Sequence, residues 1–426
     1  MLNKSYKSIV CHPELRNKIK KKSTIDSTDC INEAILLANS LNIYVEFSKI
    51  FKIDSPNNST LFSNGQIEII NNKINELKID LLIVDGKLSP IQQRNLEKRL
   101  SLKVIDRTRL ILDIFEKRAV TREGALQVEL AQLEYQKTRL VKSWTHLERQ
   151  RGSLSFIGGP GESQLEIDRR LINQQIIKLK NKLKDFKNTR TLHRNQRNKK
   201  PYFIIAIVGY TNAGKSTLFN KLTGECVLSR NMLFATLDTK MKKIANGNLK
   251  NVIITDTVGF ISELPTELIM SFRSTLEEIN YADLIINVRD ASSKYAEVQN
   301  IDVLNTIEQI GKEIKNDNYL EVLNKADLIE TERLKLIKTN KSSNQVLLSA
   351  LSGEGLGDLL AEIEKMMNSS HEIHKIKLDY SKPAIESWLH ENATILDKKY
   401  YNDHVNFKFK ITKENHSRFL SLIRNK

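Results

Sequence analysis

The chain has 426 residues, with 67 Lys and Arg against 51 Asp and Glu, and a formal net charge of +16. Hydrophobic residues make up 40% and charged residues 28%, which is ordinary globular composition and excludes a disordered, fibrous or disulfide-dense chain. The three cysteines lack metal-site spacing, and no apolar run approaches the roughly 20 residues of a membrane span. We therefore expect a cytoplasmic protein with a polyanionic partner.

Residues 1–110 alternate short apolar runs with helical stretches, a pattern that predicts a small N-terminal α/β domain. Apolar runs bounded by turn residues favour strands, and amphipathic stretches favour helices. The expected strands cover 44–51, 81–85 and 103–106, the expected helices cover 31–42 and 89–100, and 58–67 reads as a loop.

Apolar residues in 111–200 recur at the spacing of heptad seams. The stretch RGSLSFIGGPGESQ (151–164) interrupts the pattern with a glycine-rich break. We therefore expect a helical hairpin with antiparallel arms and a tip loop at 152–163. The seam residues are Leu126, Leu130, Leu133, Leu140, Trp144 and Leu147 in the first arm, and Ile172, Ile176, Leu179, Leu183 and Phe186 in the second.

The excess positive charge is concentrated in the second arm of this hairpin. Residues 165–200 hold 12 basic and 3 acidic residues, a net +9 out of the +16 of the whole chain. The final stretch, 187–200, carries six Lys or Arg and no acid. A solvated helix face is the common interpretation of such a run, and an RNA contact is the alternative. The arginines expected at RNA are Arg190, Arg194 and Arg197.

Residues 201–368 return to α/β alternation, with the strongly apolar runs that are typical of buried parallel strands. Residues 369–426 predict a small C-terminal α/β domain, with a strand at 403–411 and a helix at 414–423. The strands expected in the middle domain cover 203–208, 251–256, 284–290, 320–325 and 345–350.

The stretch GYTNAGKS (209–216) is a P-loop motif that follows an expected strand and opens a helix expected at 217–222. Its glycines let backbone N–H groups converge on phosphate oxygens, and the helix N-terminus adds a favourable dipole. Lys215 is expected to bridge the β- and γ-phosphates, and the Ser216 hydroxyl to ligate Mg²⁺. The motif therefore predicts a nucleoside triphosphate as the ligand.

The stretch DTVG (256–259) also ends an expected strand, in the order that a GTPase requires. Asp256 is expected to hold Mg²⁺ through a water molecule, and the Gly259 N–H to sense the γ-phosphate. Phe260 follows at the position where many GTPases place a glutamine that orients the attacking water. Since phenylalanine cannot make that hydrogen bond, we expect slow intrinsic hydrolysis unless a partner completes the site.

Two later stretches predict specificity for guanine. In NKAD (324–327), the Asp327 carboxylate can accept both N1–H and N2–H₂ of guanine, a pair of donors that adenine lacks. The stretch SAL (349–351) follows the last expected strand, where a backbone N–H can reach guanine O6. Together the motifs predict GTP rather than ATP.

Two further residues are candidates for roles around the phosphates. Thr236, within LFATLD (233–238), is the candidate switch threonine that caps Mg²⁺, and an ordinary turn or strand threonine is the alternative. Asn212 stands where cation-activated GTPases use an asparagine to help hold K⁺, and a loop-stabilising asparagine is the alternative. Mg²⁺ is thus the expected cofactor and K⁺ a candidate second one, and Lys215, Thr236 and Gly259 are the expected catalytic residues.

The expected fold class is α/β: an N-terminal α/β domain with a long antiparallel helical hairpin, a Ras-like P-loop domain with a mostly parallel sheet, and a small C-terminal α/β domain. The residues expected to contact GTP lie in five segments of the middle domain. They are Gly209, Tyr210, Thr211, Asn212, Ala213, Gly214, Lys215, Ser216 and Thr217; Phe234, Ala235 and Thr236; Asp256, Thr257, Val258 and Gly259; Asn324, Lys325, Ala326 and Asp327; and Ser349, Ala350 and Leu351.

The chain resembles the HflX family of ribosome-associated GTPases. The likeness is dense over about 85–290 and looser in the first 80 and last 60 residues, so it extends beyond the motifs shared by all GTPases. The stretches that carry it are LSPIQQRNLEKRL, VIDRTRLILDIFEKRAVTREGALQVELAQLEY, HLERQRG, GGPGESQLEIDRR, VGYTNAGKSTLFN, LFATLDT and DTVGFISELPTELIMSFRSTLEE.

The resemblance implies hydrolysis of GTP to GDP and phosphate, binding to the large ribosomal subunit and its RNA, and separation of stalled ribosomes under stress. It implies that the tip loop reaches toward the peptidyl transferase region, although Ser153 and Gly158 depart from the family's usual tip. We expect the chain to be a monomer. Two alternatives to ribosome separation stay open: a large-subunit assembly GTPase, and a nucleotide-regulated RNA-binding or remodelling protein. The RNA contacts implied at the tip are Arg151, Gly152, Ser153, Gly158 and Gly159.

Overall fold

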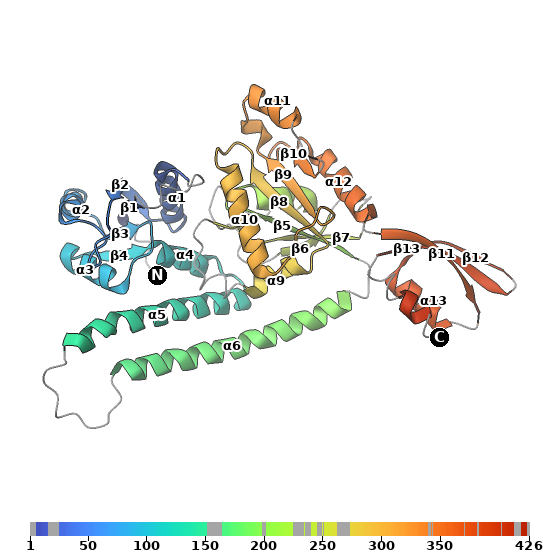
Figure 1. Cartoon of the computed structure of the whole chain (residues 1–426), viewed down its shortest axis with the longest axis horizontal. Helices are drawn as coiled ribbons and strands as arrows, with labels where there is room; N and C mark the ends of the chain where they lie inside the picture. Colours follow the sequence, from blue (N-terminus) through green and yellow to red (C-terminus); the bar gives the residue numbers. More distant parts are fainter. Residues whose placement is uncertain are drawn as a thin grey trace.

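The computed structural model describes most of the chain, and its strands form three separate sheets within the described ranges. Figure 1 shows these sheets in chain order from one end of the molecule to the other, with a helical hairpin running alongside the first two. The described residues are 6–15, 25–150, 164–197, 202–224, 234, 240–244, 249, 251–261, 273–339, 342, 344–369, 371–380, 383–401, 403–412 and 419–423.

The N-terminal sheet has four parallel strands in the order β2-β1-β3-β4. Because alternate residues of a strand point to opposite faces, Val10 and Ile83 pack toward α1 and α4, whereas Ile9 and Leu82 pack toward α2 and α3. The elements are β1 (Lys7–Leu15), α1 (Ser27–Ser40), β2 (Tyr44–Ile53), α2 (Asn64–Leu77), β3 (Leu81–Val84), α3 (Pro90–Leu100), β4 (Lys103–Asp106) and α4 (Arg107–Arg118).

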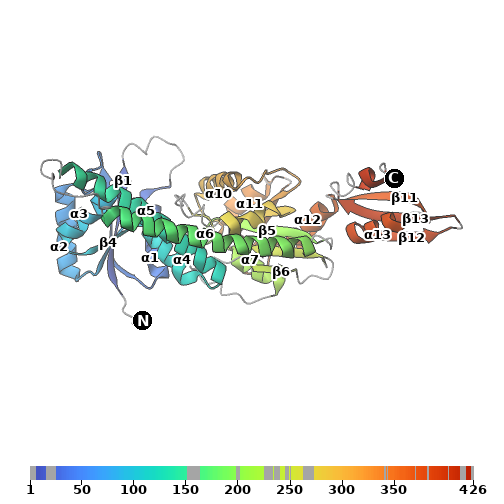
Figure 2. The ribbon, with the colours of Figure 1, turned by 90° about the horizontal axis from the view of Figure 1, so that it is seen from below.

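Two long helices, α5 (Arg122–Gln150) and α6 (Gln164–Arg197), form the antiparallel hairpin that the heptad pattern predicts (Figure 1). Leu130 of α5 packs against Ile176 and Leu179 of α6 in a small cluster of its own. Figures 1 and 2 both show α6 running from beside α5 to the central sheet. Within the described residues, no helix is long and apolar enough to cross a membrane.

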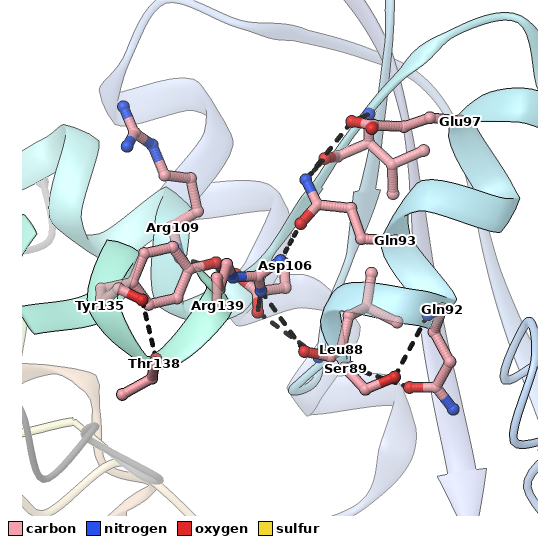
Figure 3. A network of polar contacts seen from close by, with 11 residues as sticks. Leu88, Ser89, Gln92, Gln93, Glu97, Asp106, Arg109, Tyr135, Thr138 and Arg139 are labelled. Atoms are coloured by element: carbon pink, nitrogen blue, oxygen red, sulfur yellow. Dashed lines mark hydrogen bonds and ion pairs between the residues drawn. The ribbon is translucent and has the colours of Figure 1, made fainter. Parts of the chain in front are cut away.

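A polar network around Arg139 fixes α5 to the N-terminal sheet (Figure 3). The Arg139 guanidinium donates to Asp106 Oδ2 at 2.6 Å and also to the side chain of Gln93. Asp106 ends β4, caps α4 by accepting from the Arg109 N–H at 2.8 Å, and accepts from Tyr135 Oη at 2.8 Å. Since the Asp106 side chain is fully buried, its pairing with Arg139 holds α5 against the end of β4.

The central sheet has six strands in the order β10-β9-β8-β5-β7-β6, all parallel except the β6–β7 pair. Helices α7 and α12 pack on one face. The other face shares one continuous hydrophobic core with α1 and α4 of the N-terminal part. The elements are β5 (Phe203–Gly209), α7 (Lys215–Thr223), β6 (Lys240–Lys243), β7 (Val252–Asp256), α9 (Arg273–Asn280), β8 (Leu284–Asp290), α10 (Ala296–Ile310), β9 (Tyr319–Asn324), η3 (Ala326–Leu328), α11 (Thr331–Thr339), β10 (Gln345–Leu347) and α12 (Leu356–Ser369).

The C-terminal sheet is antiparallel, with the strand order β11-β13-β12. Helix α13 packs on one face, where Leu389 meets Phe407 and Phe409 in a separate core. This small domain extends beyond the central sheet, away from the N-terminal part (Figure 1). Its elements are β11 (His371–Asp379), α13 (Pro383–Asn392), β12 (Thr394–Tyr400) and β13 (His404–Thr412).

The structure confirms the α/β fold class and corrects several local predictions. The segment 58–67 is not wholly a loop, because α2 begins at Asn64. The expected strand at 345–350 ends at Leu347, and α7 begins at Lys215 rather than at 217. The helix expected at 414–423 is described only from 419 to 423.

Candidate functional site

The P-loop lies between β5 and α7, at the carboxyl end of the central parallel strands. Its first glycine, Gly209, has φ 144°, and a Cβ there would lie 2.2 Å from the carbonyl oxygen of Val288. Gly214 has φ 95°, and Asn212 also adopts the left-handed conformation with φ 60°. The turn therefore needs backbone that L side chains rarely adopt, which is how such a loop aims its N–H groups inward.

Lys215, the first residue of α7, is buried inside this turn. Its Nζ donates to the carbonyl oxygen of Tyr210 at 2.6 Å, and a Cβ on Gly259 would lie 2.9 Å from the same nitrogen. Burial lowers the pKa of Lys215 to about 8, against the opposing charge of Asp256. Because burial disfavours the ammonium here, an anion bound in the loop stabilises its charged form.

Ser216 and Asp256 bring two oxygen groups together beside the loop. The Ser216 hydroxyl donates to Asp256 Oδ2 at 2.9 Å, and the Asp256 side chain is buried at the end of β7. In the described part of the chain, no three His, Cys, Asp or Glu side chains are grouped so as to hold a metal ion. Hydroxyl and carboxylate oxygens are the donors that Mg²⁺ prefers, and it commonly takes its other ligands from phosphates and water.

The segment after β7 is joined to the P-loop by two backbone hydrogen bonds. The Thr211 N–H donates to the Phe260 carbonyl at 2.7 Å, and the Phe260 N–H donates to the Gly209 carbonyl at 3.1 Å. The Phe260 side chain is buried in the core shared with the N-terminal part. Residue 260 therefore helps to pack the two parts together and offers no side-chain hydrogen bond to a water molecule.

Asn324, at the end of β9, ties the P-loop to the segment after β10. Its Nδ2 donates to the Ala213 carbonyl at 2.8 Å, and its Oδ1 accepts from the Ala350 N–H at 2.9 Å. Lys325 has φ 64° and its Nζ lies 2.7 Å from Asp290 Oδ2. Asp327 is exposed on the short helix η3. The structure thus brings together 209–217, 256–259, 324–327 and 349–351 at one edge of the sheet, as the motif order predicts.

Several predicted residues lie outside what the structure describes. They are Ala235, Thr236 and the tip residues Arg151, Gly152, Ser153, Gly158 and Gly159, while for Arg190, Arg194 and Arg197 the description covers the backbone in α6 only. Phe234 is described: its buried ring lies 4.7 Å from the ring of Phe115 in α4, nearly perpendicular to it.

Sequence reasoning missed a chain of polar contacts that leads from the P-loop into the N-terminal part. Tyr210 Oη donates to Glu33 Oε2 of α1 at 2.7 Å, and Arg107 donates to Glu33 as well. Arg107 also donates to Asp85 Oδ1 at 2.7 Å, and His12 Nδ1 lies 2.8 Å from Asp85 Oδ2. Nothing in the local patterns points to this contact, because Glu33 and Tyr210 are 177 residues apart.

Four sequence families match successive parts of the chain. The N-terminal part matches "GTP-binding GTPase N-terminal" over 28–116, and the hairpin matches "GTP-binding GTPase Middle Region" over 118–197. The nucleotide-site region matches "50S ribosome-binding GTPase" over 204–325, and the last part matches "HflX C-terminal domain" over 335–420.

Curated relatives match over most of the chain. "GTPase HflX" of Magnetococcus marinus is 40% identical over 384 residues, which covers 90% of this chain and 88% of that protein. "GTPase HflX" of Escherichia coli is 40% identical over 329 residues, which covers 74% and 76% respectively. Among solved structures, "crystal structure of SsGBP and GDP complex" is 26% identical, covers 84% of this chain and 98% of that one, and gives a TM-score of 0.48.

Proposed function

The chain belongs to the HflX family of GTPases, and we propose that it binds the large ribosomal subunit and separates the subunits of stalled ribosomes. The chain is a GTPase, which hydrolyses GTP to GDP and phosphate. The proposal rests on the physical connection between the nucleotide site and the long basic hairpin. The hydrophobic core beside the P-loop continues into the N-terminal helices from which that hairpin extends. GTP binding would then favour the ribosome-bound form, and hydrolysis would release it.

In the proposed reaction, the P-loop N–H groups and the Lys215 ammonium hold the phosphates, and the Gly259 N–H meets the γ-phosphate. Ser216, Thr236 and Asp256 would hold Mg²⁺, the last through water. When bound, this ion would neutralise charge that develops on the phosphate oxygens. The pairing of Ser216 with Asp256 supports this assignment, since it already places two oxygens at one point.

We propose that Asp327 selects guanine by accepting two N–H groups of the base. Asp327→Asn should lower GTP affinity by roughly two to four orders of magnitude, because two hydrogen bonds to a charged group are lost at roughly 1.5–3 kcal/mol each. The asparagine amide can donate to the 2-oxo group of xanthine, so XTP affinity should rise. Titration with fluorescent, non-hydrolysable analogues of GTP and XTP measures both changes, and Asp317→Asn is an exposed control in the same domain. Unchanged GTP affinity would contradict the assignment.

Asn212 is proposed to help hold K⁺ beside the phosphates. The Asn212 side chain is exposed and its backbone is left-handed, and both features support this proposal. GTP hydrolysis should be faster in KCl than in NaCl at equal ionic strength, and Asn212→Ala should remove that difference. Equal rates in the two salts for the unchanged chain would leave Asn212 as a loop-stabilising residue.

Sedimentation of intact ribosomes tests the separating activity. With the full chain and GTP, we expect free subunits to increase, whereas GDP should give no increase. Binding to isolated large subunits should be tighter with a non-hydrolysable GTP analogue than with GDP. Binding without any rise in free subunits would favour the assembly GTPase, and GTP-independent RNA binding would favour the RNA-remodelling protein.

The basic arm of the hairpin is the proposed contact to ribosomal RNA, together with the tip loop. Replacing Arg190, Arg194 and Arg197 with glutamine should weaken binding to the large subunit. The slope of log affinity against log salt concentration should become shallower by about 0.7–0.9 for each phosphate contact that is lost. A second variant provides the matched control, with three exposed lysines of the GTPase domain changed to glutamine: Lys315, Lys335 and Lys365.

We propose that the chain is divided into four domains or subdomains, 1–110, 111–200, 201–368 and 369–426. We also propose that it acts as a monomer in the cytoplasm.

A further inference from the structure

The C-terminal sheet has two unlike faces. One face packs on α13 through a core that includes Val405, Phe407 and Phe409 of β13. Since directly opposed residues of antiparallel strands share a face, the register assigns the alternate residues of β13 and their partners to the opposite side. Within the described residues no helix packs on that side, and Figure 1 shows α13 on the other side of the sheet.

Lysines dominate this open side. Lys375 of β11 stands opposite Lys408 of β13, and one step along the strands Lys377 and Lys399 flank Asn406 from the two neighbouring strands. All four lysines are exposed. Because residues two apart on a strand are about 6.6 Å from each other and strands are about 4.8 Å apart, these ammonium groups can spread over one extended polyanion.

An aromatic pair lies at one end of the same side. The rings of Tyr401 and His404 stack with centroids 4.8 Å apart and planes inclined by 8°, and Tyr401 is 49% exposed. Tyr380 Oη donates to the Tyr401 carbonyl at 2.7 Å, which fixes the turn that presents the pair. A flat, half-exposed ring that already stacks on one face can receive an unpaired base on the other.

The acidic residues of this region are partly neutralised by neighbours. Asp397 stands opposite Lys408 on the open side and lies 3.9 Å from Lys399 Nζ, and Asp403 pairs with the His404 ring. Asp379 stands opposite His404 at the aromatic end. The lysine rows beside Asn406 therefore keep a positive balance.

We propose that this surface, the lysine face (Lys375, Lys377, Lys399, Lys408, Asn406, Tyr401 and His404), binds single-stranded RNA. The lysines contact phosphates, and Tyr401 stacks on a base. This pairing of charge with a stacking ring favours RNA over a lipid surface, which offers anions but no planar group, and over an acidic protein segment. The inference goes beyond the proposed function, because it adds an RNA contact in the C-terminal domain, which lies at the opposite end of the molecule from the N-terminal sheet.

Acetylation of lysines in the full-length GDP-bound chain tests the proposal, read by mass spectrometry with and without a 12-nucleotide oligouridine. We expect the RNA to protect Lys375, Lys377 and Lys408 but not Lys335 or Lys365. Because protection is read residue by residue, RNA bound to the hairpin does not contribute to it. Equal modification with and without RNA overturns the proposal, as does protection by phosphatidylserine vesicles alone.

Two variants separate the phosphate contacts from the base contact, with affinity for fluorescein-labelled oligouridine read as anisotropy. Changing Lys375, Lys377 and Lys408 to glutamine should weaken binding about tenfold and flatten its salt dependence. Tyr401→Ala should weaken binding about tenfold at an unchanged salt slope, since stacking carries no charge. The control is the variant with Lys315, Lys335 and Lys365 of the GTPase domain changed to glutamine. If both lysine-face variants bind the RNA as tightly as this control does, the inference is overturned. Ribosome sedimentation tests the proposed ribosome-separating function independently, because protection of the lysine face from acetylation does not require ribosomes.

Discussion

Gly214→Ala is expected to abolish useful nucleotide binding, with GDP affinity lowered by roughly a hundredfold or more. Gly214 has φ 95°, and a Cβ there would lie 2.1 Å from Asn324 Nδ2. That amide donates to the Ala213 carbonyl, so the collision displaces the bond between the P-loop and the segment that we propose recognises the base. Left-handed strain of roughly 1–2 kcal/mol and the loss of both Asn324 side-chain hydrogen bonds, to the Ala213 carbonyl and from the Ala350 N–H, at about 1 kcal/mol each give about 3–4 kcal/mol. Titration with a fluorescent GDP analogue measures the loss.

Gly311→Ala separates collision from backbone strain. Gly311 ends α10 with φ 91°, close to that of Gly214, but a Cβ there would meet nothing within 4 Å. This control should lose roughly 1–2 kcal/mol of stability and keep its GDP affinity. If Gly214→Ala bound GDP as well as Gly311→Ala does, the contact between Asn324 and the P-loop would not be required for nucleotide binding.

The five parallel strands of the central sheet were predictable because burial on both faces leaves almost continuous apolar runs. The antiparallel strand β6 was not predicted, because its sequence, Lys-Met-Lys-Lys, is mostly charged. Residues 203–208 and 284–290 are such runs, and the structure has β5 and β8 there. The first strand of the chain was not predicted. In β1, only Ile9 to Cys11 are apolar and fully buried, and His12-Pro13-Glu14 follows, so its neighbours rather than its own pattern identify it as a strand.

The start of α2 shows how cap residues can be mistaken for a loop. The polar stretch Ser63-Asn64-Gly65-Gln66 has a turn-like composition, but it holds a capping box. The Gln66 N–H donates to Ser63 Oγ at 3.4 Å, and Gln66 Oε1 accepts from the Ser63 N–H at 3.0 Å. A serine followed three residues later by glutamine signals a helix start, so this helix could have been found from the sequence.

The nucleotide site was predictable because its motifs are local, whereas its connection to the N-terminal part was not. Backbone turns and short side-chain spacings define the P-loop, and sequence patterns record both. The hydrogen bond of Tyr210 to Glu33 depends on how two sheets pack together. On α1 alone, Glu33 reads as one more charge on a solvated face.

Arg107→Met is expected to lower the free energy of unfolding by about 3–5 kcal/mol, because it leaves the buried Asp85 and the partly buried Glu33 carboxylates without their shared cation. Arg107 donates to Glu33 and to Asp85, and it is buried together with Asp85. Since Glu33 also accepts from Tyr210, the loss should loosen the contact between the P-loop and the N-terminal part. Urea unfolding of the nucleotide-free chain measures the change.

The pH dependence of the same variant shows whether uncompensated charge is the cause. Burial alone would raise the pKa of Asp85, but the charge of Arg107 and the hydrogen bond from His12 together hold it below its usual value. In the unchanged chain, Asp85 therefore contributes stability above its unfolded pKa of about 3.9, and this is lost as the pH falls through the lower folded pKa. Without Arg107, burial dominates and the folded pKa rises. The deficit of Arg107→Met should then shrink as the pH falls from 7 toward 4.

Arg109→Met is the matched control, because it makes the same change two residues along α4. Arg109 pairs with Asp113 at 2.8 Å, but about a third of its side chain is exposed, and a pair one helical turn apart is worth less than about 1 kcal/mol. Arg109→Met should therefore cost under about 1 kcal/mol, with little change between pH 7 and 4. Equal losses of stability for the two variants would mean that Arg107 contributes no more than an ordinary surface ion pair. A larger loss at Arg107 that did not shrink at low pH would point to lost packing rather than to the stranded carboxylates.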